Sequence, residues 1–265
     1  MREGGTEPVE MLRRLTYTHL RLGDRELALS DFAQHLDDHG PDAESLEIVP
    51  YLHQHGVDRA ALVDLLNATY DRTGGDVDVV RALASLLPPV EAAELLTAHV
   101  EAHPTDTELL RDLVARRLRH AQQADAPPRE ALDLVIATIT RRPELAASAA
   151  DALLDPADDL TALRDVTLDI PPDETTPRRA VRHYLAGLIA VRLDQFEQQV
   201  THLRQSLELN PNLHAARLAL AAALVRDGQY EEALPLLADY PEQSDVRVVR
   251  LRIELLGETG RSQEA

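Results

Sequence analysis

Two pairs of histidines are the first residues whose spacing could support chemistry. His35 and His39 are four residues apart, and so are His99 and His103. Two imidazoles at this spacing lie on one face of a helix and can share a metal ion. No third ligand at metal-site spacing is evident beside either pair. Both pairs fall near the end of an expected helix, where the dipole favours partly charged histidine, so we favour a repeated helix-end feature over a metal site.

Other reactive groups are either absent or unremarkable. The chain has no Cys and no Lys, which excludes thiolate nucleophiles, disulfides, Schiff-base lysines and phosphate-loop lysines. Adjacent carboxylates such as Glu231–Glu232 mean little among 46 acidic residues, and most should lie on solvated faces or at helix starts. Hydrolase, zinc-protease and nucleotide-binding motifs are missing. The sequence therefore predicts a non-catalytic protein without a cofactor.

The charge balance limits the classes of partner. The formal net charge is −19, from 46 acidic and 27 basic residues. Nucleic acids and anionic membranes both favour a positive surplus, so neither is an expected partner. The polar start of the chain and the shortness of its most apolar run, Leu213 to Val225, argue against a signal peptide and against membrane insertion. We expect a soluble, cytoplasmic protein whose acidity reflects either salt adaptation or a basic partner.

The sequence repeats itself near its C-terminal end. The stretch from Gly187 to Phe196 aligns with the stretch from Ala221 to Tyr230, and the two are 34 residues apart. A third, partial copy begins at Leu255. Apolar residues recur at three- and four-residue spacing almost throughout, which predicts helices. A period of this length indicates stacked helix pairs.

This pattern resembles the tetratricopeptide repeat, whose 34-residue unit has small residues at its eighth and twentieth places. A unit that starts at Ala180 matches this pattern with Gly187 at the eighth place, Phe196 at the seventeenth, Leu203 at the twenty-fourth and Pro211 at the thirty-second. Gln199, at the twentieth place, departs from it. The next unit starts at His214 and places Ala221, Tyr230 and Ala233 correctly. The resemblance implies an all-α fold, a right-handed α-α superhelical solenoid of helix pairs.

Fainter units begin at Val9, Asp42 and Gly74. The expected organisation is a flexible N-terminus over 1–8, degenerate repeats over 9–169, a linker over 170–177 and clear repeats over 178–265, the last of them truncated. The helices of the middle stretch match the family poorly.

The family lines a concave groove with its first helices, and the resemblance implies which residues face a partner. Carried over, the groove residues are Arg13, Tyr17, Leu20, Arg21, Tyr184, Leu188, Val191, Arg192, Leu218, Val225 and Arg226. Arg21, Arg192 and Arg226 all fall on the thirteenth place. They could form a row of forked donors for acidic side chains or a terminal carboxylate. Alternatively, each one satisfies the last carbonyls of its own helix. The basic set used by chaperone-tail-binding members is absent, so that ligand is not implied.

The last repeat stops at Ala265, where its second helix should begin, and Leu251, Leu255 and Leu256 should then lack cover. We expect either continuation in a longer protein, which we favour, or self-association through this repeat. The predicted function is a non-catalytic protein–protein interaction scaffold that binds a partner protein or peptide through its groove. The alternatives are a structural or regulatory arm of a larger enzyme or assembly machine and, less favoured, a helical enzyme.

Overall fold

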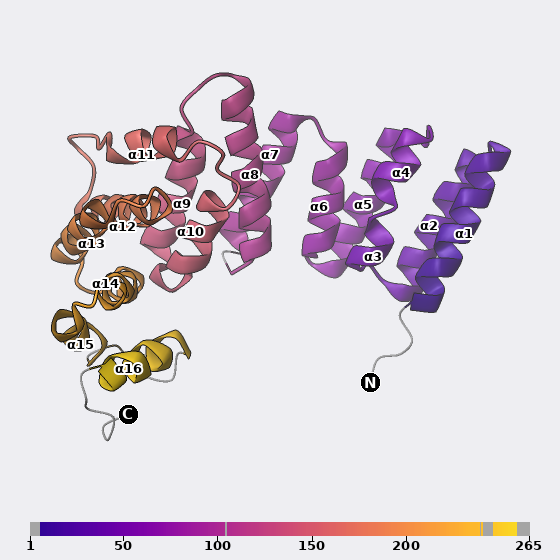
Figure 1. The fold of residues 1–265 in the computed structure, drawn as a ribbon. Coiled ribbons are helices and arrows are strands. Elements are labelled where there is room, and N and C mark those ends of the chain that lie inside the picture. The colour runs from indigo at the N-terminus through magenta and orange to yellow at the C-terminus, as the bar shows by residue number, and fades with distance from the viewer. Residues whose placement is uncertain (1–5, 104, 239, 241–245, 259–265) are drawn as a thin grey trace. The chain divides into compact units, whose positions relative to one another are not determined.

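The computed structural model describes residues 6–103, 105–238, 240 and 246–258. Within these ranges the chain is helical and has no strand (Figure 1). It divides into two compact units, Met1–Leu109 and Leu110–Ala265. None of the described helices is both long enough and apolar enough to cross a membrane.

The first unit contains three successive groups of helices. Its elements are α1 (Thr6–Leu22), α2 (Arg25–His39), α3 (Ala43–Leu46), α4 (Val49–Gln54), α5 (Arg59–Thr73), α6 (Val77–Leu86) and α7 (Pro89–Ala102). Helix α1 packs on α2, α5 packs on α4 and α6, and α6 packs on α7 (Figure 1). Phe32, Leu52 and Leu62 are fully buried in the shared core of this unit. The units that the sequence predicts from Val9, Asp42 and Gly74 correspond to these groups.

Aspartates begin several of these helices. The carboxylate of Asp42 accepts the Ser45 N–H at 2.8 Å, and the Ser45 hydroxyl accepts the Asp42 N–H in return. Asp58 and Asp76 cap α5 and α6 in the same way, through the first free N–H groups of each helix. These bonds satisfy donors that have no partner within the helix, which explains why each helix starts where it does.

The second unit continues the pattern with longer and shorter pairs. Its elements are α8 (Thr107–Gln123), which starts just before the division, α9 (Arg129–Arg141), η1 (Pro143–Leu145), α10 (Ala146–Leu154), α11 (Leu160–Leu168), α12 (Thr176–Arg192), α13 (Phe196–Leu209), α14 (His214–Arg226), α15 (Tyr230–Ala238) and α16 (Val246–Glu258). Helix α12 packs extensively on α13, and α14 packs on α13, α15 and α16. The predicted all-α fold of tetratricopeptide-like helix pairs is confirmed.

A close approach of two helices lies at Gly187, as its eighth place in the repeat predicts. A Cβ at this position would lie 2.7 Å from the Cγ of Leu203 and 3.3 Å from the backbone oxygen of Gln199, both on α13. Only a residue without a side chain lets α12 and α13 approach this far. The bulky Gln199 at the twentieth place is tolerated, because its side-chain oxygen accepts a bond from Arg226 on the following helix, α14.

The turns within the pairs show the repeat more clearly than the helices do. Gly23, Gly56 and Gly228 each follow the first helix of a pair with a positive φ, between 75° and 86°. Asp125 and Asp194 occupy the equivalent turns after α8 and α12, with φ of 49° and 57°. Aspartate tolerates this left-handed conformation better than most residues with side chains. The same turn conformation thus recurs after α8, in a stretch whose sequence matches the family poorly.

A buried ion pair holds the connection between α11 and α12. Arg182 and Glu174 are 2.5 Å apart, with only 5% and 4% of their side chains exposed. The guanidinium of Arg182 also donates to the carbonyl of Val166 at the end of α11. Glu174 accepts a second bond from Arg178 at 3.0 Å. Charges this deep are tolerated only when they are partnered, and these bonds tie Glu174 to α12 and α12 to the end of α11.

The apolar face of the last helix differs from the expectation. Leu255 and Leu256 are 0% and 5% exposed, because this side of α16 packs on α14 and α15. The exposed apolar residues are Val246, Val249 and Ile253, on another side of the helix. The prediction that Leu255 and Leu256 lack cover is therefore wrong. Helix α16 has two apolar stripes, and the sequence did not reveal which of them faces inward.

Candidate partner-binding site

The groove residues of the first unit differ in how accessible their side chains are to a partner. The guanidinium of Arg13 lies 3.3 Å from the Glu47 carboxylate and 3.6 Å from that of Glu44, so it ties α1 to the start of the next pair. Tyr17 is 42% exposed, and its ring meets that of Tyr51 edge to face at 4.6 Å. Arg21, in the last turn of α1, is exposed. Tyr17 and Arg21 therefore offer the accessible surface here, while Leu20 is half-buried.

In the second unit, the groove positions at the middle of the helices are largely covered. Tyr184 is 3% exposed, and burial, with the nearby Asp151 carboxylate, raises the pKa of its hydroxyl. Leu218 and Val225 are 8% and 4% exposed. These side chains have little surface to offer a partner, whereas Leu188 is half-buried and keeps part of its surface.

In the second compact unit, the arginines at the thirteenth place of a repeat form hydrogen bonds with residues of earlier helices. Arg192 donates to Asp155, at the end of α10, at 2.9 Å. Arg226 donates to the side-chain oxygen of Gln199, on α13, at 2.7 Å. The first bond thereby joins α12 to the end of α10, and the second joins α14 to α13. Neither of these bonds goes to a backbone carbonyl at the end of the arginine's own helix.

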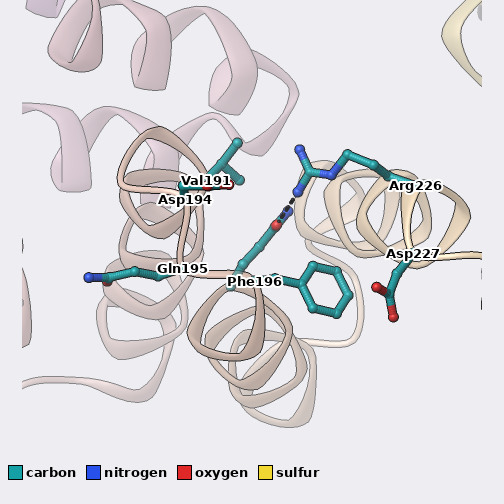
Figure 2. A pocket seen from close by; sticks show the side chains of 7 residues that line it. Val191, Asp194, Gln195, Phe196, Arg226 and Asp227 are labelled. Carbon is teal, nitrogen blue, oxygen red and sulfur yellow. Dashed lines mark hydrogen bonds between the residues drawn. The ribbon is translucent and has the colours of Figure 1, made fainter.

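A hollow of about 240 Å³ opens beside Arg226, between the turn after α12 and the end of α14 (Figure 2). Its lining residues are Val191, Asp194, Gln195, Phe196, Gln199, Arg226 and Asp227. In Figure 2 a dashed line marks the bond that Arg226 donates to Gln199, and the labelled ring of Phe196 lies near it. The hollow therefore lies where two successive repeats meet.

The polar groups of this hollow suit a peptide segment. A guanidinium carries five N–H donors in a fixed plane, and the bond to Gln199 leaves others for a carboxylate or a peptide carbonyl. The carboxylates of Asp194 and Asp227 can accept peptide N–H groups, and the half-buried Phe196 ring adds an apolar contact. The groove residues predicted from the sequence included Val191 and Arg226 but not the other five residues that line the hollow. The sequence indicated one of those five, Gln199, because glutamine is unusual at the twentieth place of the repeat.

The histidine pairs lie where the spacing predicts, at the ends of α2 and α7. The ring centroids are 4.9 Å apart for His35 and His39, and 4.4 Å apart for His99 and His103. Burial, reinforced by the partner histidine, lowers the pKa of His35 and of His99. Both shifts favour the neutral form of the inner histidine of each pair. The described residues contain no cluster of three or more His, Cys, Asp or Glu side chains that could hold a metal ion.

Comparison with known proteins gives a family for the last repeats. The tetratricopeptide repeat model matches residues 192–252, and no curated protein matches the chain. Among solved structures, a thermophilic TPR protein of Thermus thermophilus is 20% identical over 95% of this chain and 98% of its own, with a TM-score of 0.28. The TPR2AB domain of yeast Sti1, solved in complex with pHSP90, is 13% identical over 98% and 100%, with a TM-score of 0.30.

These identities and TM-scores are too low to support any argument, so the family assignment depends on the matched segment alone. That segment begins at the end of α12 and includes α13, α14, α15 and part of α16. It also contains every residue that lines the hollow beside Arg226 except Val191. Residues 192–252 of the chain therefore form a tetratricopeptide repeat segment.

Proposed function

We propose that this protein is a non-catalytic interaction scaffold that binds a segment of a partner protein through its tetratricopeptide groove. Repeats of this kind form protein-interaction scaffolds, and the matched segment contains a hollow between successive repeats. The observation on which the proposal depends is the position of Arg226, at the thirteenth place, on the wall of that hollow. The proposal places the protein in the cytoplasm.

The chemistry of the hollow suggests what the partner presents. Among the described residues, Arg226 is the only arginine that lines it, and its remaining donors fit a carboxylate in one plane. Asp194 and Asp227 would repel a second acidic group, so a single acidic side chain or a terminal carboxylate on an otherwise neutral segment fits better than an acidic run. Leu188 and Arg192, and in the first unit Arg13, Tyr17 and Arg21, are proposed as further contacts.

The test is capture of a partner from the source lysate, followed by measurement of its affinity for purified variants by isothermal titration calorimetry. Arg226→Ala should weaken binding by roughly tenfold, which is typical for one partner of a charge-assisted bond at an interface. Arg204→Ala is the matched control, because Arg204 is half-exposed on α13 and bonded to Glu232 at 2.6 Å, outside the hollow. Equal affinities for the two variants would contradict the proposed site.

A second candidate function has one observation in its favour. Val246, Val249 and Ile253 are 79%, 40% and 58% exposed and lie on one stripe of α16. Exposed apolar stripes of this kind usually meet another helix. The array would then associate with a second copy, or form an arm within a larger assembly. Sedimentation velocity with Ile253→Glu tests the first possibility: a dimer of the unchanged protein that the variant abolishes would support self-association, and a monomer at all concentrations would exclude it.

A further inference from the structure

A second hollow of the second unit lies away from the groove residues. It has a volume of about 500 Å³, and it is formed by the end of α8, the turn that follows it, the connection between α10 and α11, and one side of α11. Its apolar lining comes from Leu118, Ala121, Ala126, Pro127, Pro128, Pro156, Ala157, Ala162, Leu163 and Val166. Leu163 and Val166 are buried, most of the prolines and alanines are half-buried, and Ala126 and Pro127 are exposed.

Short helices leave this hollow open. Helices α10 and α11 are nine residues each, compared with 17 for α12 and 14 for α13. One weak bond crosses between the two sides, from the Gln122 amide on α8 to the carboxylate of Asp158 at 3.4 Å. An apolar space of this size with rigid proline walls can admit a side chain without rearrangement.

The rim of the hollow is acidic. Asp125, Asp158, Asp159 and Asp165 line it, and Arg119 is the single basic residue among its lining residues. Two of the carboxylates are already used, because Asp159 caps α11 and Asp165 pairs with Arg164 at 2.8 Å. Asp125 and Asp158 are exposed, at the turn after α8 and before α11 respectively. An apolar floor below two accessible carboxylates favours a ligand that is apolar along its length and positively charged at its tip.

We propose that this hollow is a second binding site, which takes an arginine or lysine side chain from an extended segment of a partner protein. The aliphatic stem would lie on Leu163 and against the proline walls, and the charged head would reach Asp125 and Asp158. Long basic side chains commonly bury their stems in this way while the head stays at the rim. The net charge of −19 would help to attract such a segment. This site is separate from the Arg226 hollow and does not depend on it.

The experiment uses the full chain and two labelled peptides, fluorescein-Gly-Gly-Arg-Leu-Arg-Gly and the same peptide with both arginines replaced by glutamate. Fluorescence anisotropy gives the affinity of each one. The test variants are Asp125→Asn, which removes a rim charge, and Ala162→Leu, which fills the hollow from α11. The matched control is Asp194→Asn, because Asp194 has the same residue type, the same left-handed turn and the same place in the repeat but lines the other hollow. Circular dichroism confirms that each variant folds.

The proposal expects the arginine peptide to bind and the glutamate peptide not to bind. Asp125→Asn should weaken the arginine peptide by roughly three- to fivefold, the effect of one exposed ion pair, while Asp194→Asn leaves it unchanged. Ala162→Leu should weaken it by about tenfold or more, because the stem loses its space. Equal binding of both peptides, no binding up to millimolar concentration, or sensitivity to Asp194→Asn alone would each overturn the proposal. The last result would instead place the peptide at the Arg226 hollow.

Discussion

Replacing Gly187 with alanine tests the close contact between α12 and α13. In a helix this substitution ordinarily stabilises a protein by roughly 0.5–1 kcal/mol, since alanine restricts the unfolded chain. Here the new Cβ would lie 2.7 Å and 2.9 Å from two carbons of Leu203. Leu203 is fully buried, and the backbone oxygen of Gln199 is 3.3 Å away on the same side, so neither can yield easily.

The gain in helix propensity and the cost of the steric contact oppose each other, and the cost should be the larger of the two. Overpacking of a filled core costs about 1–3 kcal/mol, and a contact this short belongs in the upper part of that range. After the gain from alanine is subtracted, Gly187→Ala should destabilise the protein by about 1–2 kcal/mol. Gly187→Leu should cost more. Urea unfolding followed by circular dichroism measures the difference.

Gly257→Ala is the control for this prediction. Gly257 also lies in a helix, α16, but a Cβ there would meet nothing within 4 Å. The same substitution should therefore stabilise α16 slightly. Leu203→Ala in the Gly187→Ala background should cost less than Leu203→Ala alone, because it removes the clashing atoms. Stabilisation by Gly187→Ala, or additive effects in the double variant, would refute the close approach.

Three further changes follow from the buried and strained residues. Glu174→Ala should lower the free energy of unfolding by about 3 kcal/mol, because it leaves Arg182 charged and buried without its main partner. The double variant Glu174→Leu with Arg182→Met should lower it by less, and urea unfolding compares the two variants. Asp194→Gly should stabilise by up to about 1 kcal/mol and Asp194→Ala should destabilise by a similar amount, since the positive φ suits glycine, as thermal unfolding can show. Because the pKa values of His35 and His99 are lowered in the folded protein, both histidines are protonated at a higher pH in the unfolded chain than in the folded one. The free energy of unfolding should therefore fall as the pH drops below about 6.5. Replacing both histidines with leucine should reduce this fall in urea midpoints between pH 7.5 and 5.5, and an unchanged fall would contradict the assignment.

The repeat itself could be predicted because its signals are local. Gly187 and Ala221 mark close approaches 34 residues apart, and each lies buried at a helix contact. Gly23 and Gly228 mark turns that need a positive φ. Such requirements depend on a few neighbouring residues, so they remain visible in a single sequence.

The candidate site was harder to predict because its contacts join distant residues. The partner of Arg226, Gln199, is 27 positions earlier, and that of Arg192, Asp155, is 37 positions earlier. Nothing in either arginine's own helix indicates such a partner. Likewise, only the packing of α16 shows that Leu255 faces inward while Ile253 is exposed. The burial of Tyr184, which is 3% exposed, was likewise not indicated by its groove position in the repeat.

Hydrogen–deuterium exchange on the protein with and without its captured partner tests the central claim most directly. If the partner lies in the groove, amides at the end of α12, in the turn that follows it and at the end of α14 should exchange more slowly in the complex, over about residues 188–199 and 224–229. The same measurement on the Arg226→Ala variant should show weaker protection there. Protection confined to the exposed sides of α13 and α15, with none at these segments, would contradict the proposed groove.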